Sequence, residues 1–363
     1  MAIRPQRARR EWWLRSTCRG SRAKYAGLAA DPLHFVMSTT SRTTSSTTNS
    51  TVGGGANPAA ELRAMMDAGC VAAPGSFNAL CAKAVARNGF TATYVSGAAT
   101  SVAAGVPDVG VLGLEHFCRV IREVADAGGL PVIADADTGF GEAEMVRRTV
   151  IEYARAGAAA LHLEDQKFPK RCGHLDGKEL VSQDHMIEKV QWAAAAAQQM
   201  AKLPNGQMAK EDAKPAIIVC ARTDAKGVEG FDAAVARAKA YVAAGAEMIF
   251  PEGLASADEF AKFAQAMGQS ANRRGGPYLL ANMTEFGKTP LIPLREFAQM
   301  GYSVVIYPVS MLRVAMGAVD RALRSLRESG SVEPFIGEMQ TRKELYELIG
   351  YTPGVAWEWP TGR

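Results

Sequence analysis

Two carboxylates placed two residues apart are the first side chains in this sequence that could do chemistry together. In Asp135-Ala136-Asp137 both side chains can reach one hard cation. Mg²⁺ favours such a site, with few carboxylates and with retained waters and substrate oxygens. Asp108, in an upstream loop, and Glu164 are further candidates for the same site. Zn²⁺ is disfavoured, because Cys172 and His174 have no further soft ligands nearby.

The segment Lys167–Gly177 (KFPKRCGHLDG) carries the second candidate, Cys172. Its neighbours Lys170, Arg171 and His174 supply positive charge, and nearby cations lower the pKa of a thiol and favour the thiolate. The turn-forming residues of the segment are Pro169, Gly173 and Gly177. They favour a lid, and a lid that closes over substrate excludes water. We therefore interpret Cys172 as reactive, and the other five cysteines as unreactive residues of a reducing compartment.

Other polar residues keep a structural interpretation beside the functional one. Arg222, Arg313 and Arg342 could each bind a carboxylate bidentately, although spacing alone favours surface or ion-pair roles. Helix N-caps are the alternative interpretation for Ser76, Ser310 and Asp224. The histidines interpreted as structural are His34, His116, His162 and His185.

Short apolar runs precede most of these residues and predict the elements that position them. The predicted strands are Val71–Pro74, Ala92–Val95, Pro131–Ala134, Ala160–Leu163, Ile217–Ala221, Met248–Phe250, Tyr278–Ala281 and Val304–Tyr307. Helical patterns lie between them, for example at Leu112–Ala127, Glu142–Ala156 and Phe231–Ala244. Apolar strands that alternate with helices predict a parallel sheet. Eight such units predict an α/β protein, a (β/α)8 TIM-type barrel with a C-terminal helical extension.

A barrel of this type carries its active site just past the C-terminal ends of the strands. In this sequence those positions read Gly75-Ser76, Ser96-Gly97, Asp135-Ala136-Asp137, Glu164-Asp165, Arg222-Thr223-Asp224, Glu252, Asn282-Met283-Thr284 and Pro308–Ser310. Carboxylates, an arginine and an amide at one end of a barrel predict an enzyme. No GxGxxG follows the first strand, which disfavours a dinucleotide-binding sheet.

Composition separates the first residues from the rest of the 363-residue chain. Residues 1–36 carry eight basic and two acidic side chains, a net charge of +6, and residues 38–55 are rich in Ser, Thr and Gly. With +4 for the whole chain, residues 37–363 carry four minus six, or −2. We predict a disordered leader at 1–57, a catalytic barrel at 58–330 and a helical extension with a tail at 331–363.

The leader at residues 1–57 is compatible with more than one cellular location. It is interpreted as a disordered arm, as sequence upstream of a true start at Met37, or as an organellar transit peptide. We expect a cytoplasmic protein, or a mitochondrial matrix protein if the leader is a transit peptide. No run reaches the roughly 18 apolar residues of a membrane span, so we expect no membrane partner.

Nine motifs give the chain a resemblance to a known family. They are Pro74–Asn78, Tyr94–Gly97, Ala134–Gly141, Leu163–Gln166, Lys170–His174, Ala221–Asp224, Phe250–Glu252, Asn282–Glu285 and Met339–Arg342. With these residues the chain resembles the isocitrate lyase/phosphoenolpyruvate mutase superfamily, and within it the lyases of 2-methylisocitrate. The run Lys-Arg-Cys-Gly-His marks the lyase branch. Phe250 before Pro251-Glu252, without long insertions, resembles the members that act on methylisocitrate.

The resemblance implies Mg²⁺-dependent cleavage of 2-methylisocitrate to pyruvate and succinate in propionate catabolism, by a homotetramer. It implies a metal held by Asp135 and Asp137, with Asp108 and Glu164 acting through water. The implied catalytic residues are Tyr94 as base, Cys172 as acid, and Lys170. The implied substrate-binding residues are Ser96, Gly97, Ala98, Gly173, His174, Arg222, Glu252, Asn282, Met283, Thr284, Arg313 and Arg342. One departure is Ser96-Gly97-Ala98-Ala99, where related lyases commonly have Ser-Gly-Gly-Gly.

Two alternatives remain open at this point. An enzyme of the same fold could act on isocitrate, dimethylmalate or oxaloacetate. A nucleic-acid-binding protein could use the basic leader, since basic arms bind phosphates. Residues 37–363, however, show no basic stripe with interleaved aromatic residues. We therefore expect a small dicarboxylate or tricarboxylate as the partner of this chain and no nucleic acid.

Overall fold

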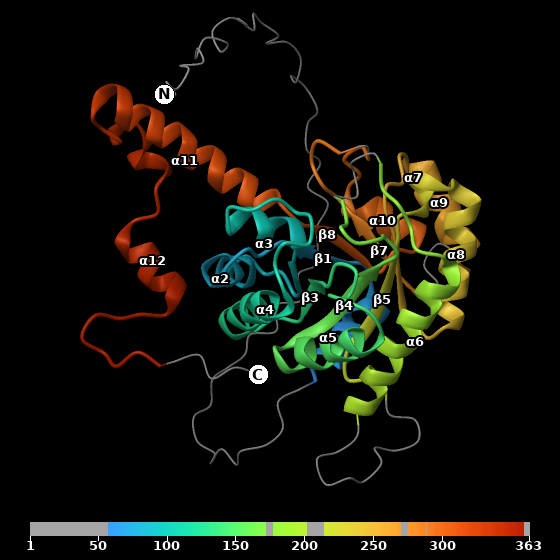
Figure 1. Cartoon of the computed structure of the whole chain (residues 1–363). Coiled ribbons are helices and arrows are strands. Elements are labelled where there is room, and N and C mark those ends of the chain that lie inside the picture. Colours follow the sequence, from blue (N-terminus) through green and yellow to red (C-terminus); the bar gives the residue numbers. More distant parts are fainter. Residues whose placement is uncertain (1–56, 172–176, 202–213, 270–274, 288, 359–363) are drawn as a thin grey trace, which may run out of the picture. The chain divides into compact units, whose positions relative to one another are not determined.

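The computed structural model of the chain describes residues 57–171, 177–201, 214–269, 275–287 and 289–358. In this part of the chain, eight strands form a barrel with helices around it, which confirms the predicted (β/α)8 architecture (Figure 1). Three predicted site residues, Cys172, Gly173 and His174, lie outside the described residues, and so does the leader up to residue 56. Within the described residues, no helix is long and apolar enough to cross a membrane.

The strands are all parallel and follow one another around the barrel. They are β1 (Val71–Pro74), β2 (Thr93–Val95), β3 (Val132–Asp135), β4 (Ala158–Glu164), β5 (Ile218–Thr223), β6 (Met248–Pro251), β7 (Tyr278–Asn282) and β8 (Val304–Tyr307). β8 pairs with β1, and a parallel bridge between Gly75 and Tyr94 joins the end of β1 to β2. The observed ends of all eight strands lie within two residues of the predicted ones.

Helices connect the strands and cover the outside of the barrel. They are α1 (Pro58–Ala68), α2 (Ala79–Arg87), α3 (Gly97–Ala103), α4 (Leu114–Gly128), α5 (Ala143–Arg155), α6 (Gln183–Met200), α7 (Ala225–Val228), α8 (Phe231–Ala243), α9 (Ala257–Ala266), α10 (Leu294–Met300), α11 (Ser310–Ser329), the 3₁₀ helix η1 (Glu333–Glu338) and α12 (Arg342–Ile349). α4 shows why they form: Phe117, Ile121 and Val124 recur at helical spacing and are buried. It ends at Gly129, whose φ of +59° suits glycine.

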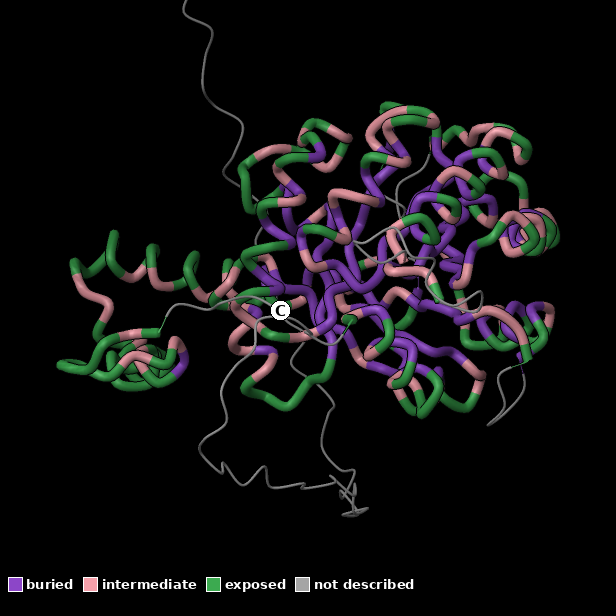
Figure 2. The backbone as a smooth tube through the Cα atoms, turned by 90° about the horizontal axis from the view of Figure 1, so that it is seen from below, coloured by how far each residue is buried: buried purple, intermediate pink, exposed green. Residues whose placement is uncertain are grey.

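The core has two layers, and buried residues gather along the strands (Figure 2). Side chains that alternate along the strands fill the barrel interior, and the intervening ones pack against the helices. α1 joins the interior layer through Ala59, Leu62 and Met66. Its Arg63 forms a bidentate ion pair with Glu247, which directly precedes β6. Because this contact lies at the N-terminal ends of the strands, α1 covers the barrel end opposite the predicted active site.

C-terminal helices follow the last strand, and η1 and α12 lie within the predicted extension at 331–363. α11 runs outward from the barrel, and α12 lies beside α2 (Figure 1). Leu312 is the only buried residue of α11, which exposes several large apolar side chains. These exposed residues are Met311, Val314, Met316, Val319, Leu323 and Leu326. The bounds of the predicted domains, 58–330 and 331–363, stay predictions.

We expect Leu62→Ala to lower the free energy of unfolding by about 2–5 kcal/mol. Leu62 is fully buried where α1 meets the barrel interior, and its truncation removes apolar contacts and leaves a cavity. Urea unfolding followed by far-UV circular dichroism measures the change. Leu80→Ala, at a residue 42% exposed on α2, is the control and should cost less than about 1 kcal/mol. Equal losses in the two variants would contradict the position of α1.

Candidate active site

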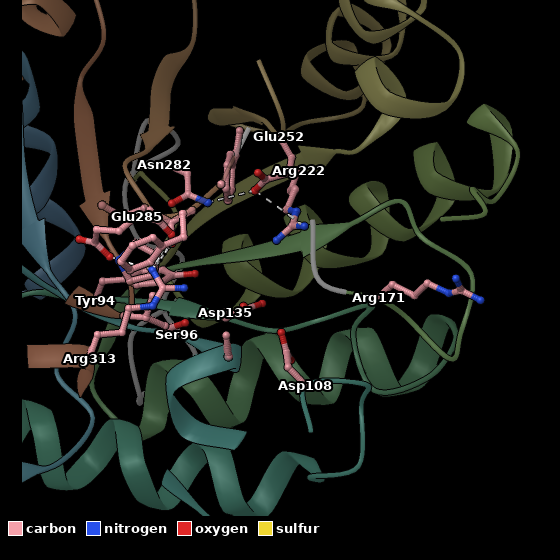
Figure 3. A pocket seen from close by; sticks show the side chains of 18 of the residues that line it. Tyr94, Ser96, Asp108, Asp135, Arg171, Arg222, Glu252, Asn282, Glu285 and Arg313 are labelled. Atoms are coloured by element: carbon pink, nitrogen blue, oxygen red, sulfur yellow. Dashed lines mark hydrogen bonds and ion pairs between the residues drawn. The ribbon is translucent and has the colours of Figure 1, made fainter. Parts of the chain in front are cut away.

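A cavity of about 250 Å³ lies at the C-terminal ends of the strands. Figure 3 shows side chains from several strands and their following loops around it, with Arg222 and Glu252 on one side and Asp108 and Asp135 on another. Eleven predicted site residues line it: Tyr94, Ser96, Ala98, Asp108, Asp135, Lys170, Arg222, Glu252, Asn282, Thr284 and Arg313. Residues far apart in the sequence therefore meet where the barrel architecture predicts an active site.

Asp135 ends β3 and is held by two backbone amides. Its Oδ1 accepts the N–H of Asp137, and its Oδ2 accepts the N–H of Gly97, both at 3.0 Å. A Cβ at position 97 would lie 2.7 Å from Asp135 Oδ2, so this close approach requires glycine. Burial opposes the charge of Asp135, but nearby His162 and Lys170 favour it and lower the pKa of this carboxyl to about 2.

Lys170 is buried among the predicted metal ligands. Its Nζ lies 2.7 Å from Asp137 Oδ1 and also donates a hydrogen bond to Asp108. Burial alone would lower the pKa of Lys170, but Glu164 and the neighbouring aspartates raise it, so the ammonium stays charged. Burial and the charge of Asp135 raise the pKa of Asp137 to about 6, against the pull of Lys170. The lysine therefore binds two of the four carboxylates that the sequence assigns to Mg²⁺.

The buried charges around the cavity do not balance. The buried carboxylates are Asp135, Asp137, Glu164, Asp224 and Glu252, and the buried cationic side chains are Lys170, Lys178 and Arg222. Five minus three leaves a formal excess of two negative charges. Uncompensated buried charge is costly, so this excess favours a bound cation.

The oxygen atoms also fit a divalent cation. Oε1 of Glu164 is buried without a hydrogen-bond partner, whereas its Oε2 pairs with Arg222 at 3.3 Å and Oδ1 of Asp137 pairs with Lys170 at 2.7 Å. In the described part of the chain, however, no three His, Cys, Asp or Glu side chains are arranged to hold a metal by themselves. The residues thus fit Mg²⁺ held by few carboxylates together with water and substrate oxygens, rather than a closed protein cage.

Tyr94 makes a contact that the sequence did not reveal. Its hydroxyl lies 2.7 Å from Nε2 of His162, and both side chains are buried inside the barrel. Burial, followed by the charge of Asp135, raises the pKa of Tyr94, so the phenol keeps its proton in this environment. Burial lowers the pKa of His162 to about 4. His162 lies two residues before Glu164 on β4, and this spacing, which puts both on the inner face, is the sequence signal for the contact.

Arg222 lies at the centre of an ion-pair network. Asp224 accepts from its Nε at 2.9 Å and from its Nη2 at 3.2 Å, and Glu164 lies 3.3 Å from its Nη1. The guanidinium also stacks over Phe250, 5.2 Å from the ring centre. Arg222 is 7% exposed, so the surface interpretation is wrong and the ion-pair interpretation is confirmed.

The N-cap interpretation is wrong for Ser76 and Ser310, whereas Asp224 does occupy the N-cap position of α7. Ser76 Oγ hydrogen-bonds Thr93 Oγ1 at 2.7 Å, and Ser310 donates to Glu285. Asp224 precedes α7 but makes no capping hydrogen bond, because its carboxylate binds cations instead. Ser96, which was predicted to bind substrate, does act as an N-cap and accepts from the amide of Ala99.

Arg313 lies at the rim of the cavity, 42% exposed. Its Nη1 donates to the backbone oxygen of Glu285 at 2.7 Å and to the Glu285 carboxylate at 2.8 Å. Thr284 Oγ1 lies 3.3 Å away. On the facing side, Asn282 donates to Glu252 at 3.3 Å. Glu285 was missed as a site residue, although it directly follows the predicted Asn282-Met283-Thr284 at the end of β7.

Five other predicted residues that the structure describes lie outside the cavity lining: Gly97, Asp137, Glu164, Met283 and Arg342. Met283 is buried, and its Sδ accepts from the amide of Ile292. Arg342 is exposed at the start of α12. Of the two alanines in the departure from the family pattern, Ala98 lines the cavity, whereas Ala99 packs against the first turn of α11.

Comparison with known proteins agrees with this geometry. The sequence profile of the family described as phosphoenolpyruvate phosphomutase matches residues 62–327. The chain belongs to this family. Several curated 2-methylisocitrate lyases are 39–46% identical to it. One is the probable 2-methylisocitrate lyase 2 of Corynebacterium glutamicum, 46% identical over 278 residues, which are 77% of this chain and 83% of that protein.

Solved structures of the family extend the comparison. A crystal structure of 2,3-dimethylmalate lyase matches with a TM-score of 0.71 and 33% identity, over 81% of this chain and 91% of that one. Phosphonopyruvate hydrolase in complex with oxalate and Mg²⁺ matches with a TM-score of 0.67 and 29% identity, over 81% and 95%. The predicted superfamily membership is confirmed, and the family includes metalloenzymes.

We expect the His162 ring to stay neutral from pH 8 down to about pH 5, because burial lowers its pKa to about 4. Since the unfolded chain takes up this proton near pH 6.5, stability falls as the pH drops from 6.5 toward 4. Ring-nitrogen chemical shifts, assigned with a His162→Asn variant, measure the titration. A midpoint near 6.5 in the folded protein would contradict the buried contact with Tyr94.

Proposed function

We propose that this chain is a carbon–carbon lyase that cleaves 2-methylisocitrate into pyruvate and succinate with Mg²⁺. The observation that carries the proposal is the cavity, which Asp108 and Asp135 line together with Arg222 and Arg313 at the barrel end. The 2-methylisocitrate lyases at 39–46% identity support this substrate. A small, highly charged cavity suits a tricarboxylate whose charge is divided between a metal ion and arginines.

Asp135 and Asp137 are the proposed direct metal ligands, with Asp108 and Glu164 acting through water. The amide of Gly97 orients Asp135, and Glu164 supplies Oε1, which has no hydrogen-bond partner. When bound, Mg²⁺ withdraws electron density from the hydroxyl and carboxylate oxygens of the substrate and lowers the pKa of that hydroxyl.

Arginine, amide and hydroxyl donors hold the other end of the substrate in this proposal. Arg222, Asn282, Thr284 and Arg313 bind the carboxylates of the succinate half, and Glu252 orients Asn282. Ser96, Gly97 and Ala98 lie at the pyruvate end. Donors fixed before the reaction stabilise the charge that develops in the transition state.

The bond changes require one base and one acid. Tyr94 takes the proton of the substrate hydroxyl as its own phenolic proton passes to Nε2 of His162, 2.7 Å away, and the substrate oxygen forms the carbonyl of pyruvate as the bond between C2 and C3 breaks. The electron pair of that bond passes to C3 and is delocalised into the adjacent carboxylate. Cys172 then delivers a proton to C3, which completes succinate. His162, in contact with the Tyr94 hydroxyl, orients the phenol.

Product identification tests the proposal. The chain with Mg²⁺ should release equal amounts of pyruvate and succinate from 2-methylisocitrate, EDTA should abolish the release, and added Mg²⁺ should restore it. Coupled lactate dehydrogenase assays and mass spectrometry measure the products. Faster release of glyoxylate from isocitrate, or turnover of dimethylmalate or oxaloacetate alone, would assign the chain to another reaction of the superfamily.

Cys172→Ser should lose most of kcat, about 10²-fold or more, while binding of succinate stays within about threefold of wild type. A serine hydroxyl is a far weaker acid than a thiol, but its size is similar. Steady-state kinetics and calorimetry with succinate separate the two effects. Cys118→Ser, at a partly buried position on α4, is the control. A kcat near that of wild type would remove Cys172 from the acid role.

We further propose that the chain forms a homotetramer in which α11 packs against another copy. α11 exposes Val314, Val319 and Leu323 together with the other apolar residues named above, and such exposed apolar faces mark interfaces. Light scattering after size exclusion should give four chains per particle, and Leu323→Glu should reduce this number. A wild-type particle of one chain would exclude the proposal.

A further inference from the structure

Lys178 belongs to a buried contact outside the residues assigned to substrate or metal. Its Nζ donates to Oδ1 of Asp224 at 2.7 Å, and the side chains of the pair are 6% and 0% exposed. The same Oδ1 also accepts from Nη2 of Arg222 at 3.2 Å. One carboxylate thus binds two cations, of which only Arg222 lines the cavity.

The second cation determines how much positive potential Arg222 presents to a ligand. Asp224 occupies the Nε–Nη2 edge of the guanidinium, Glu164 lies 3.3 Å from Nη1, and Glu252 lies 3.8 Å from Nη2. Three carboxylates around one arginine leave it little attraction for a fourth. Lys178 offsets the charge of Asp224. Arg222 therefore attracts a substrate carboxylate more strongly than it would beside an Asp224 without this counterion.

The backbone of this corner is fixed by other contacts. Asp165 accepts from the amide of Asp224 at 2.9 Å and from the hydroxyls of Thr223 and Tyr241 at 2.8 and 2.9 Å. Lys178 meets this corner through the side chain of Asp224, to which its Nζ donates. Its loss should therefore disturb the Asp224 carboxylate and Arg222, while the strand end and α7 keep their positions.

We propose that Lys178 is a positioning residue for dicarboxylate binding, which acts by holding and neutralising Asp224 so that Arg222 faces the cavity with its charge available. The proposal rests on the function proposed above. It assigns a binding role to a lysine that contacts neither substrate nor metal.

Lys167 supplies a matched control. The amide of Lys167 donates to the backbone oxygen of Glu179, and Gln166 bridges Leu180, so both lysines lie on one antiparallel stem. The side chain of Lys167 pairs with Glu179 at 3.2 Å, but the partners are 57% and 74% exposed. Solvent screens such a pair, and its removal should change little.

The experiment compares Lys178→Met, Lys178→Arg and Lys167→Met in the full chain with Mg²⁺. Lys178→Met should raise KM for 2-methylisocitrate and the Kd of succinate about tenfold or more, with kcat lowered less than about threefold. In Lys178→Arg, KM and Kd should stay within about threefold of wild type, because the charge is kept. In Lys167→Met, both constants should stay within about twofold of wild type. Unchanged binding in Lys178→Met, or a loss confined to kcat, would overturn the proposal.

A double-mutant cycle with Asp224→Asn identifies the route of the effect. In the Asp224→Asn chain, Lys178→Met should change KM and Kd by less than about twofold, because the carboxylate it neutralises is gone. A full effect in that background would overturn the proposal.

If Lys178→Met does not fold, Lys178→Gln replaces it. Failure of both neutral variants to fold would overturn the proposal and assign Lys178 to stability instead. A wild-type chain without turnover contradicts the proposed function, whereas wild-type turnover with unaltered variants contradicts only this inference.

Discussion

The excess of buried negative charge at the C-terminal end of the barrel is the constraint on which the rest of the site depends. Carboxylates at this density are stable only when cations or hydrogen-bond donors face them. Lys170 and Arg222 supply the charge, and the amides of Gly97 and Asp137 supply donors. What remains uncompensated is suited to a divalent cation, and the same arrangement that favours the metal attracts the hydroxyl and carboxylate oxygens of a hydroxy acid.

The barrel makes this charge density possible by separating its two ends. Apolar residues fill the interior below the site, and α1 covers the opposite end through Leu62 and Met66. The strands end in polar residues, so each strand adds one or two side chains to a shared space. His162 and Phe250 lie at the boundary, in edge-to-face contact with ring centres 5.3 Å apart. They separate the apolar interior from the charged cavity.

Much of this arrangement could be predicted from the sequence, because the relevant signals are local. Short apolar runs such as Val304–Tyr307 predict buried parallel strands, and the polar residue after each run lies at the predicted end of the barrel. Partners distant in sequence could not be predicted. Asp224 is of a residue type that favours N-caps and does precede α7. Its carboxylate nevertheless binds Lys178, which lies 46 residues earlier in the chain. His162 lies between two leucines and resembles a core residue, yet it contacts Tyr94.

The position of Lys170 gives the metal site a property that its carboxylates alone would not have. The ammonium bridges Asp108 and Asp137, so the chain carries its own counterion into the acidic cluster. A divalent ion that bound here would meet carboxylates that this ammonium already partly neutralises. Such an ion would be held less tightly than the number of carboxylates alone would give, because Lys170 is a competing positive charge. Lys170 would thus limit the affinity of the site for a metal ion, and it holds the side chains of Asp108 and Asp137 in place without one.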